Sequence, residues 1–130
     1  MYTIQRFIQA RAAGVHIEEQ EFPKRCGHVS GKKVISTTEM VGKIRAAVRV
    51  REELEPDFAI IARSDVHGTS GGSFDKLLDW CKAYIDAGAD VIFPEALPNE
   101  DELEKLATLL PVPIHYQHCV CTPHGSAIQQ

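Results

Sequence analysis

The segment Lys24-Arg25-Cys26-Gly27-His28 places a thiol between two cations and an imidazole. Neighbouring positive charge lowers the pKa of a cysteine and raises its thiolate fraction. Gly27 has no Cβ and therefore lets the backbone approach a ligand closely. This chemistry fits either a reactive loop or a solvated basic loop with an incidental cysteine, and the segment alone does not decide between them.

Charged and polar residues also follow four short apolar segments. These residues are Glu18, Arg63 with Asp65, Glu95 and Gln117. In folds whose parallel strands alternate with helices, the chemistry gathers at the carboxyl ends of the strands. The pattern is typical of a functional site, although helix capping would explain some of these residues.

The elements that must position these residues alternate along the chain. Apolar residues recur at helical spacing in segments 3–12, 36–54, 73–85 and 99–110. Short apolar runs predict strands at 15–17, 58–62, 89–93 and 112–116. Ser36 with Glu39 forms a capping box, and Ser73 and Asn99 are the residues expected to cap the next two helices.

Alternating strands and helices predict an α/β fold with parallel strands and right-handed crossovers. Four such units are half of a (β/α)8 barrel, which needs about 250 residues, whereas this chain has 130. Composition and periodicity leave two architectures open, a small open sheet of the flavodoxin type and a part of a barrel.

Several motifs resemble, in the same order, those of the isocitrate lyase/phosphoenolpyruvate mutase superfamily. The motifs are HIEEQ, KRCGH, IIARSD, AYIDAGADVIFPEA and VPI, and the resemblance covers residues from about 4 to 118. A cysteine in the KRCGH loop is specific to the lyase branch, because phosphonate-forming members generally lack it. The chain is most similar to lyases of the 2-methylisocitrate lyase type.

The resemblance implies a partial (β/α)8 TIM barrel of about four βα units in residues 1–118, followed by an irregular tail in 119–130. It also implies that the N-terminal strands of the barrel and its C-terminal part are missing. The Asp-x-Asp segment that supplies the direct metal ligands of the family is not found in this sequence. We therefore expect a truncated reading frame or a gene fragment.

The implied activity is that of a Mg²⁺-dependent carbon–carbon lyase. Such an enzyme splits a 2-hydroxy tricarboxylic or dicarboxylic acid, for example (2-methyl)isocitrate, into a 2-oxo acid and succinate. Alternatives are a non-catalytic remnant, or a member that acts on another acid, such as a dimethylmalate lyase, an oxaloacetate decarboxylase or a phosphonomutase-like enzyme. The sequence does not fix the acid or the activity of this chain alone.

Within the implied site, Cys26 matches the catalytic cysteine that protonates the carbanion formed on cleavage. Gly27 and His28 match the part of the loop that contacts substrate. A thiol with a pKa near the working pH suits this proton transfer.

The strand ends carry the other implied roles. Arg63 matches the arginine that binds a substrate carboxylate, and Glu95 matches a substrate-binding acid. Gln117 lies where the family often has asparagine, and it is expected to contact substrate. Glu18 matches the acid that supports the metal, through water rather than directly.

A second group of metal-ligating side chains lies near the end of the sequence. Its members are His115, His118, Cys119, Cys121 and His124. Zinc sites usually have at least two residues between paired cysteines, and no second pair is present, so an unstructured tail is favoured over a metal site. Elsewhere, His16 alternates with apolar neighbours and is expected in the core, and Cys81 is expected to pack as a small hydrophobic residue.

The composition is that of a globular domain, with 44% hydrophobic and 25% charged residues and a formal net charge of -4. The acidic excess argues against nucleic-acid binding, and no apolar run reaches the roughly 20 residues of a membrane span. The first residues lack the features of a secretory signal. We expect a cytoplasmic enzyme whose partner is a small carboxylic acid, and family resemblance implies a homo-oligomer, a tetramer in relatives.

Overall fold

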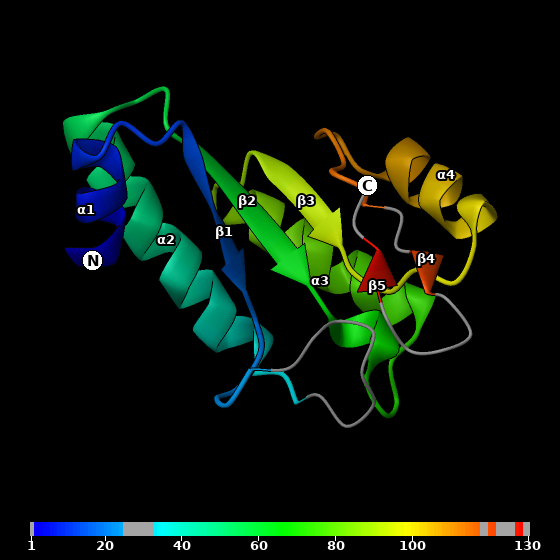
Figure 1. Ribbon diagram of the computed structural model, residues 1–130. Helices are drawn as coiled ribbons and strands as arrows, with labels where there is room; N and C mark the ends of the chain where they lie inside the picture. The colour runs from blue at the N-terminus through cyan, green and yellow to red at the C-terminus, as the bar shows by residue number, and fades with distance from the viewer. Residues whose placement is uncertain (1, 25–32, 118–119, 122–126, 129–130) are drawn as a thin grey trace.

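The computed structural model describes residues 2–24, 33–117, 120–121 and 127–128. Its centre is a parallel sheet in the order β1 (Gly14–Glu18), β2 (Ala59–Ser64) and β3 (Val91–Pro94), which lie side by side in Figure 1. The register places Glu18 beside Arg63, and Ser64 beside Pro94. The α/β fold with parallel strands is thus confirmed.

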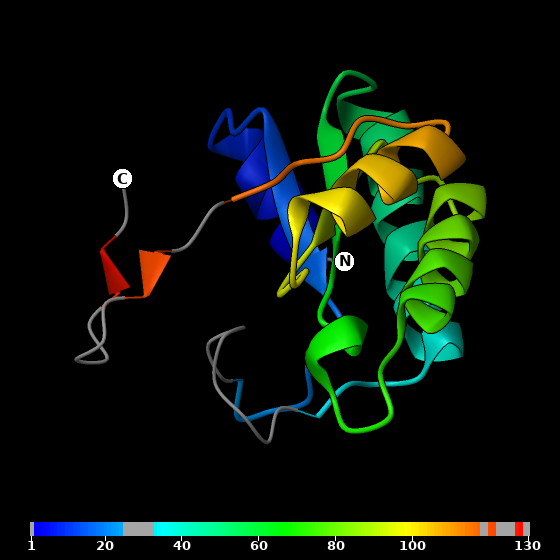
Figure 2. The same ribbon diagram turned by 90° about the vertical axis from the view of Figure 1, so that its right-hand side faces the viewer.

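Within the described part of the chain, four α-helices connect and flank these strands. They are α1 (Tyr2–Gln9), α2 (Thr37–Leu54), α3 (Phe74–Asp86) and α4 (Glu100–Leu109), with the short 3₁₀ helix η1 (Val66–Gly68) after β2. The predicted caps are confirmed, because Ser36, Ser73 and Asn99 each accept a hydrogen bond from the backbone N–H three residues later. Figure 2 shows α2 and α3 next to each other along one side of the sheet.

The hydrophobic core lies between the sheet and these helices. Ile60 and Ala62 alternate along β2 and are fully buried. They pack with the buried faces of α2 and α3, namely Met40, Ile44, Ala47, Leu77, Cys81 and Tyr84. Cys81 is a buried free thiol, as predicted.

His16 lies on the opposite face of the sheet, so its expected place in the core was wrong. Its neighbours Val15 and Ile17 pack against the core, and strand alternation therefore turns His16 away from the helices, where it is exposed. Its ring meets those of Phe93 and His115 edge-on, with centroids 5.4 Å away in each case. Partial burial is the largest cause that lowers the pKa of His16, and the nearby positive charges of His115 and Arg63 lower it further.

The predicted strand at 112–116 is reduced to a single parallel bridge between Ile92 and Ile114. Ile92 donates to the Pro113 carbonyl at 3.1 Å, and His115 donates to the Ile92 carbonyl at 2.8 Å. Pro113 has no N–H, so this part of the ladder cannot extend normally.

The tail, expected to be irregular, contains two short strands that pair antiparallel, β4 (Val120–Cys121) and β5 (Ala127–Ile128). The domain boundary near residue 118 stays a prediction. Among the described residues, no helix has both the length and the apolar character needed to cross a membrane.

Candidate functional site

Arg63 lies at the carboxyl end of β2, at the centre of a group of carboxylates. Asp65 binds it with both oxygens, since Nε is 3.1 Å from Oδ2 and Nη2 is 3.1 Å from Oδ1. Glu18 from β1 approaches Nε to 3.5 Å, and Glu95 after β3 approaches Nη2 to 3.8 Å. The structure therefore brings together three of the predicted site residues, Glu18, Arg63 and Glu95.

The guanidinium is held in a fixed orientation. Its carbon lies 5.6 Å from the centre of the Phe93 ring, and the Arg63 side chain is only 21% exposed. Burial by itself would lower the pKa of Arg63, but the hydrogen bonds and charge of Asp65, with Glu95 and Glu18, raise it overall. Arg63 therefore keeps its positive charge in this half-buried position.

The contacts of Arg63 leave it suited to a further carboxylate. Asp65 occupies the Nε–Nη2 edge of the guanidinium, and the edge that carries Nη1 is the one that a second carboxylate can meet. Planar guanidinium groups bind carboxylates in two-pronged pairs. Glu18 and Glu95 stand at longer distances from the guanidinium than Asp65 does, at 3.5 Å from Nε and 3.8 Å from Nη2.

Glu19 is a functional candidate that the sequence analysis did not single out. It is fully buried, and its Oε1 accepts hydrogen bonds from Ser64 Oγ (2.7 Å), the Asp65 N–H (2.9 Å) and the Val66 N–H (3.0 Å). Its Oε2 accepts a hydrogen bond from the Tyr84 hydroxyl. Burial raises the pKa of Glu19, although the hydrogen bonds from Tyr84, Ser64 and Asp65 oppose that rise.

Four predicted site residues remain to be placed. Cys26, Gly27 and His28 lie outside the described residues. Lys24, the last described residue before them, pairs with Glu18 at 2.7 Å and so brings the start of their segment to the strand ends. Gln117 is exposed, three residues beyond the bridge at Ile114.

Comparison with known proteins decides the family. The family model described as phosphoenolpyruvate phosphomutase matches residues 1–128. The chain belongs to the phosphoenolpyruvate mutase/isocitrate lyase superfamily. It is 41% identical over 111 residues to 2,3-dimethylmalate lyase of Eubacterium barkeri, covering 85% of this chain and 37% of that protein.

Two further members of the superfamily extend this result. The 2-methylisocitrate lyase of Bacillus subtilis is 39% identical over 112 residues, which are 86% of this chain and 35% of that enzyme. The structure of oxaloacetate acetylhydrolase in complex with 3,3-difluorooxalacetate has a TM-score of 0.84 and 37% identity, and covers 89% of this chain and 39% of that one. The chain thus spans little more than a third of the length of these relatives.

Magnesium is the metal expected in this superfamily. A structure of phosphonopyruvate hydrolase, 27% identical with a TM-score of 0.72 over 89% of this chain and 39% of that one, is a complex with oxalate and Mg²⁺. Among the residues described here, no three His, Cys, Asp or Glu side chains are placed to hold a metal ion. Glu18 instead pairs with Lys24 and Arg63, so these residues do not form a magnesium site of their own.

Two predictions about metal binding were made from the sequence, one for Glu18 and one for the cysteine–histidine tail. The role of Glu18 as a ligand through water stays a prediction. In the cysteine–histidine tail, His115 belongs to no metal-binding group among the described residues, and the side chains of His118, Cys119, Cys121 and His124 lie outside what the structure describes.

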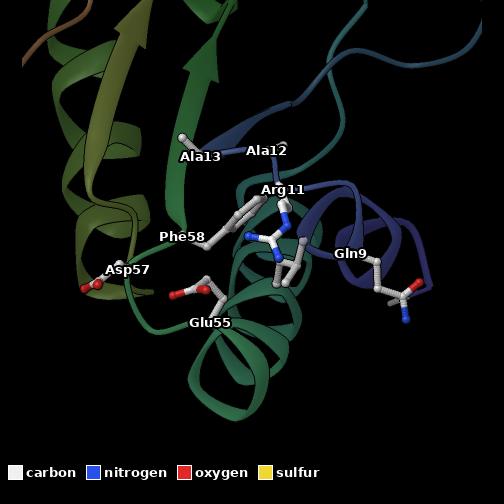
Figure 3. A pocket seen from close by; sticks show the side chains of 8 residues that line it. Gln9, Arg11, Ala12, Ala13, Glu55, Asp57 and Phe58 are labelled. Carbon is white, nitrogen blue, oxygen red and sulfur yellow. The ribbon is translucent and has the colours of Figure 1, made fainter.

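A cavity of about 520 Å³ lies at the other end of the strands, where the chain enters β1 and β2 (Figure 3). Its lining residues are Ile8, Gln9, Arg11, Ala12, Ala13, Glu55, Asp57 and Phe58. In Figure 3 the Arg11 side chain lies next to the Phe58 ring, between Glu55 and Gln9. The charged residues of this cavity are exposed, in contrast to the half-buried group around Arg63.

Proposed function

We propose that this chain forms about four βα units of a (β/α)8 barrel and contributes the carboxyl-end wall of a carbon–carbon lyase active site. The sheet order, the parallel pairing and the helices around it support this architecture. The similarity to two lyases of the superfamily supports the reaction class.

A single observation carries the proposal. Arg63 is fixed by the two-pronged contact with Asp65 and lies between the carboxylates of Glu18 and Glu95 at the carboxyl ends of three neighbouring strands. A barrel enzyme places its chemistry at that end. A rigid, half-buried guanidinium there is suited to binding the carboxylate of a small acid.

The proposed reaction cleaves a 2-hydroxy acid. The hydroxyl loses its proton, the carbon–carbon bond next to it breaks, and the oxygen becomes the carbonyl of a 2-oxo acid. The carbon that leaves takes the bonding electrons and is protonated, giving succinate or a related acid. Arg63 binds a carboxylate of the substrate, and we assign the proton donor to the thiol of Cys26 on the strength of the KRCGH motif.

Further parts of the proposal concern substrate, metal and assembly. The named relatives act on 2-methylisocitrate, 2,3-dimethylmalate and oxaloacetate, and any of these is a candidate substrate class. Mg²⁺ is proposed as the cofactor, Gln117 and the loop residues Gly27 and His28 as substrate contacts, and a cytoplasmic homo-oligomer as the working form. Light scattering of the purified protein tests the last point.

The experiment is a chimera of 2,3-dimethylmalate lyase in which residues 4–117 of this chain replace the matching segment. In the presence of Mg²⁺ the chimera should cleave one of the three candidate acids. The product would be a 2-oxo acid from 2-methylisocitrate or 2,3-dimethylmalate, and oxalate from oxaloacetate. Cys26→Ser should lower kcat by about 10²-fold or more, the scale of general acid–base effects, and change KM by less than about tenfold.

A second thiol provides the matched control. Cys81 is buried in the core, so Cys81→Ala should keep kcat close to that of the parent chimera. Near-parental kcat in Cys26→Ser would contradict the assigned proton donor, and absence of turnover with all three acids would contradict the lyase proposal itself.

A further inference from the structure

We propose that Glu19 is a positioning residue, which sets the bend of the chain after β2 and thereby holds Asp65 and Arg63 in their working orientation. The catalytic meaning of this role rests on the proposed function, whereas the positioning itself does not. Glu19 follows β1 directly, and strand alternation turns it to the face opposite Glu18.

The contacts of Glu19 join two strand ends that are far apart in the sequence. Its Oε1 receives three hydrogen bonds from consecutive residues, Ser64, Asp65 and Val66, at 2.7, 2.9 and 3.0 Å. Two of these donors are backbone N–H groups at the start of η1. The carboxylate therefore fixes the direction of the main chain as it leaves β2, and it also binds the side chain of Ser64.

Glu19 and Asp65 bind different groups around the start of η1. Asp65 occupies the N-cap position of η1, but its side chain makes no capping hydrogen bond. Glu19 accepts the N–H groups of Asp65 and Val66. The Asp65 carboxylate binds Nε and Nη2 of Arg63, so the main chain that Glu19 holds carries the side chain that orients Arg63.

The Glu19 carboxylate also has a partner in the helix layer. On the far side of Glu19, the Tyr84 hydroxyl from α3 donates to Oε2. The Glu19 carboxylate is therefore bound by Tyr84 of α3 and itself binds the backbone at the end of β2.

The experiment compares two variants of similar volume in the full 130-residue chain. Glu19→Gln keeps an acceptor oxygen, whereas Glu19→Met removes both acceptors. The main readout is hydrogen exchange of the Arg63 Nε–H, which Asp65 accepts. Exchange should be at least about tenfold faster in Glu19→Met and within about threefold of the parent in Glu19→Gln, because only the former breaks the contacts.

A stability-matched control separates positioning from general destabilisation. Leu106→Ala opens the core at α4, which supplies none of the hydrogen bonds given above for Glu19 and Arg63, and should leave the Arg63 Nε–H exchange unchanged under conditions where the chain stays folded. Unchanged exchange in Glu19→Met, or an equal change in Leu106→Ala, would overturn the proposal.

Should Glu19→Met fail to fold, the double variant Ser64→Ala/Tyr84→Phe decides instead. It removes both side-chain donors to Glu19 while keeping the carboxylate, and it should speed the Arg63 Nε–H exchange by about two- to threefold. No change would overturn the proposal.

In the lyase chimera, Glu19→Met should raise KM by about tenfold with kcat within about threefold, the pattern of lost substrate binding. A chimera without activity would count against the proposed function only, because the exchange experiment needs no substrate.

Discussion

The charged residues at the two ends of the same three strands differ in how deeply they are buried. At the carboxyl ends, Arg63 lies half-buried among Glu18, Asp65 and Glu95. At the amino ends, the charged residues around the cavity are exposed, and Arg11 is one of them.

Acidic residues at the two ends also have different partners. At the amino end of β3, Asp90 accepts the Ile60 N–H at 2.8 Å and pairs with Arg51, a contact that joins neighbouring elements. At the carboxyl ends Glu18, Asp65 and Glu95 all approach one side chain, Arg63, and Glu18 also pairs with Lys24. The contact at Asp90 joins neighbouring elements and stabilises the fold, whereas the contacts around Arg63 orient a cation, and we therefore propose the carboxyl end as the functional one.

The largest expected effect concerns the loop after η1, at the carboxyl end. A Cβ on Gly72 would lie 2.1 Å from the Val66 carbonyl and 2.5 Å from that of His67, both backbone atoms. Gly72→Ala should lower the free energy of unfolding by about 3 kcal/mol, the upper range for overpacking. Urea denaturation of the purified chain measures it.

Gly42 is the matched control for this substitution. It lies inside α2, and a Cβ there would meet nothing within 4 Å. Gly42→Ala should therefore raise the free energy of unfolding by about 0.5–1 kcal/mol. Equal effects of the two substitutions would mean that the loop after η1 is not closely packed.

The next effect comes from the hydroxyl that holds Glu19. Tyr84→Phe removes the donor to Glu19 Oε2 and should cost about 1.5–2 kcal/mol, as for other hydrogen bonds to charged groups. Tyr2→Phe, at an exposed tyrosine of α1, should change the free energy of unfolding by less than about 0.5 kcal/mol. A cost for Tyr84→Phe as small as that of Tyr2→Phe would contradict the buried contact.

A third prediction concerns pH. Burial, with a smaller effect of Glu19, raises the pKa of Cys81 from 9.0 to about 12. The folded chain then holds the thiol proton more tightly than the unfolded chain, so this stabilisation is complete below pH 9 and is lost as the pH rises toward 12. Between pH 8 and 10 the loss attributable to Cys81 should be about 1 kcal/mol.

Comparison with Cys81→Ala isolates that contribution, because Tyr84 also has a raised pKa and titrates at still higher pH. The variant should show a shallower fall of stability with pH. Identical slopes would contradict the buried, protonated state of the thiol.

The smallest effect is expected at the amino end. Arg11 has a φ of 59° and ends α1 in the left-handed conformation that favours glycine. Arg11→Gly should raise the free energy of unfolding by about 0.5 kcal/mol and leave substrate binding in the chimera unchanged. Weaker substrate binding would show that the amino end takes part in the site.

Much of this architecture could be predicted from local signals. The caps at Ser36, Ser73 and Asn99 depend on residues three positions apart, and all three form. The charged residues Glu18, Arg63 and Glu95 come together because carboxyl ends of parallel strands share one edge of the sheet.

Other features depend on tertiary contacts that spacing does not reveal. The apolar neighbours of His16 predict a core residue, but among the described residues the helices cover the opposite face of β1, where Val15 and Ile17 pack. The role of Glu19 arises from the backbone of Asp65 and Val66, more than forty residues away. One feature of the sequence does predict the burial of Glu19. Side chains alternate between the two faces of a strand, so Glu19 lies on the same face as Ile17, the face that packs against the helices.

The most direct test of the central claim, that Arg63 is a carboxylate-binding group, compares Arg63→Lys with Arg11→Lys in the lyase chimera. A point charge cannot reproduce the two-pronged contact, so Arg63→Lys should raise KM by about tenfold or more. Arg11→Lys, at the opposite end of the strands, should leave KM within about twofold of the parent. An Arg63→Lys chimera with the parental KM would contradict the account.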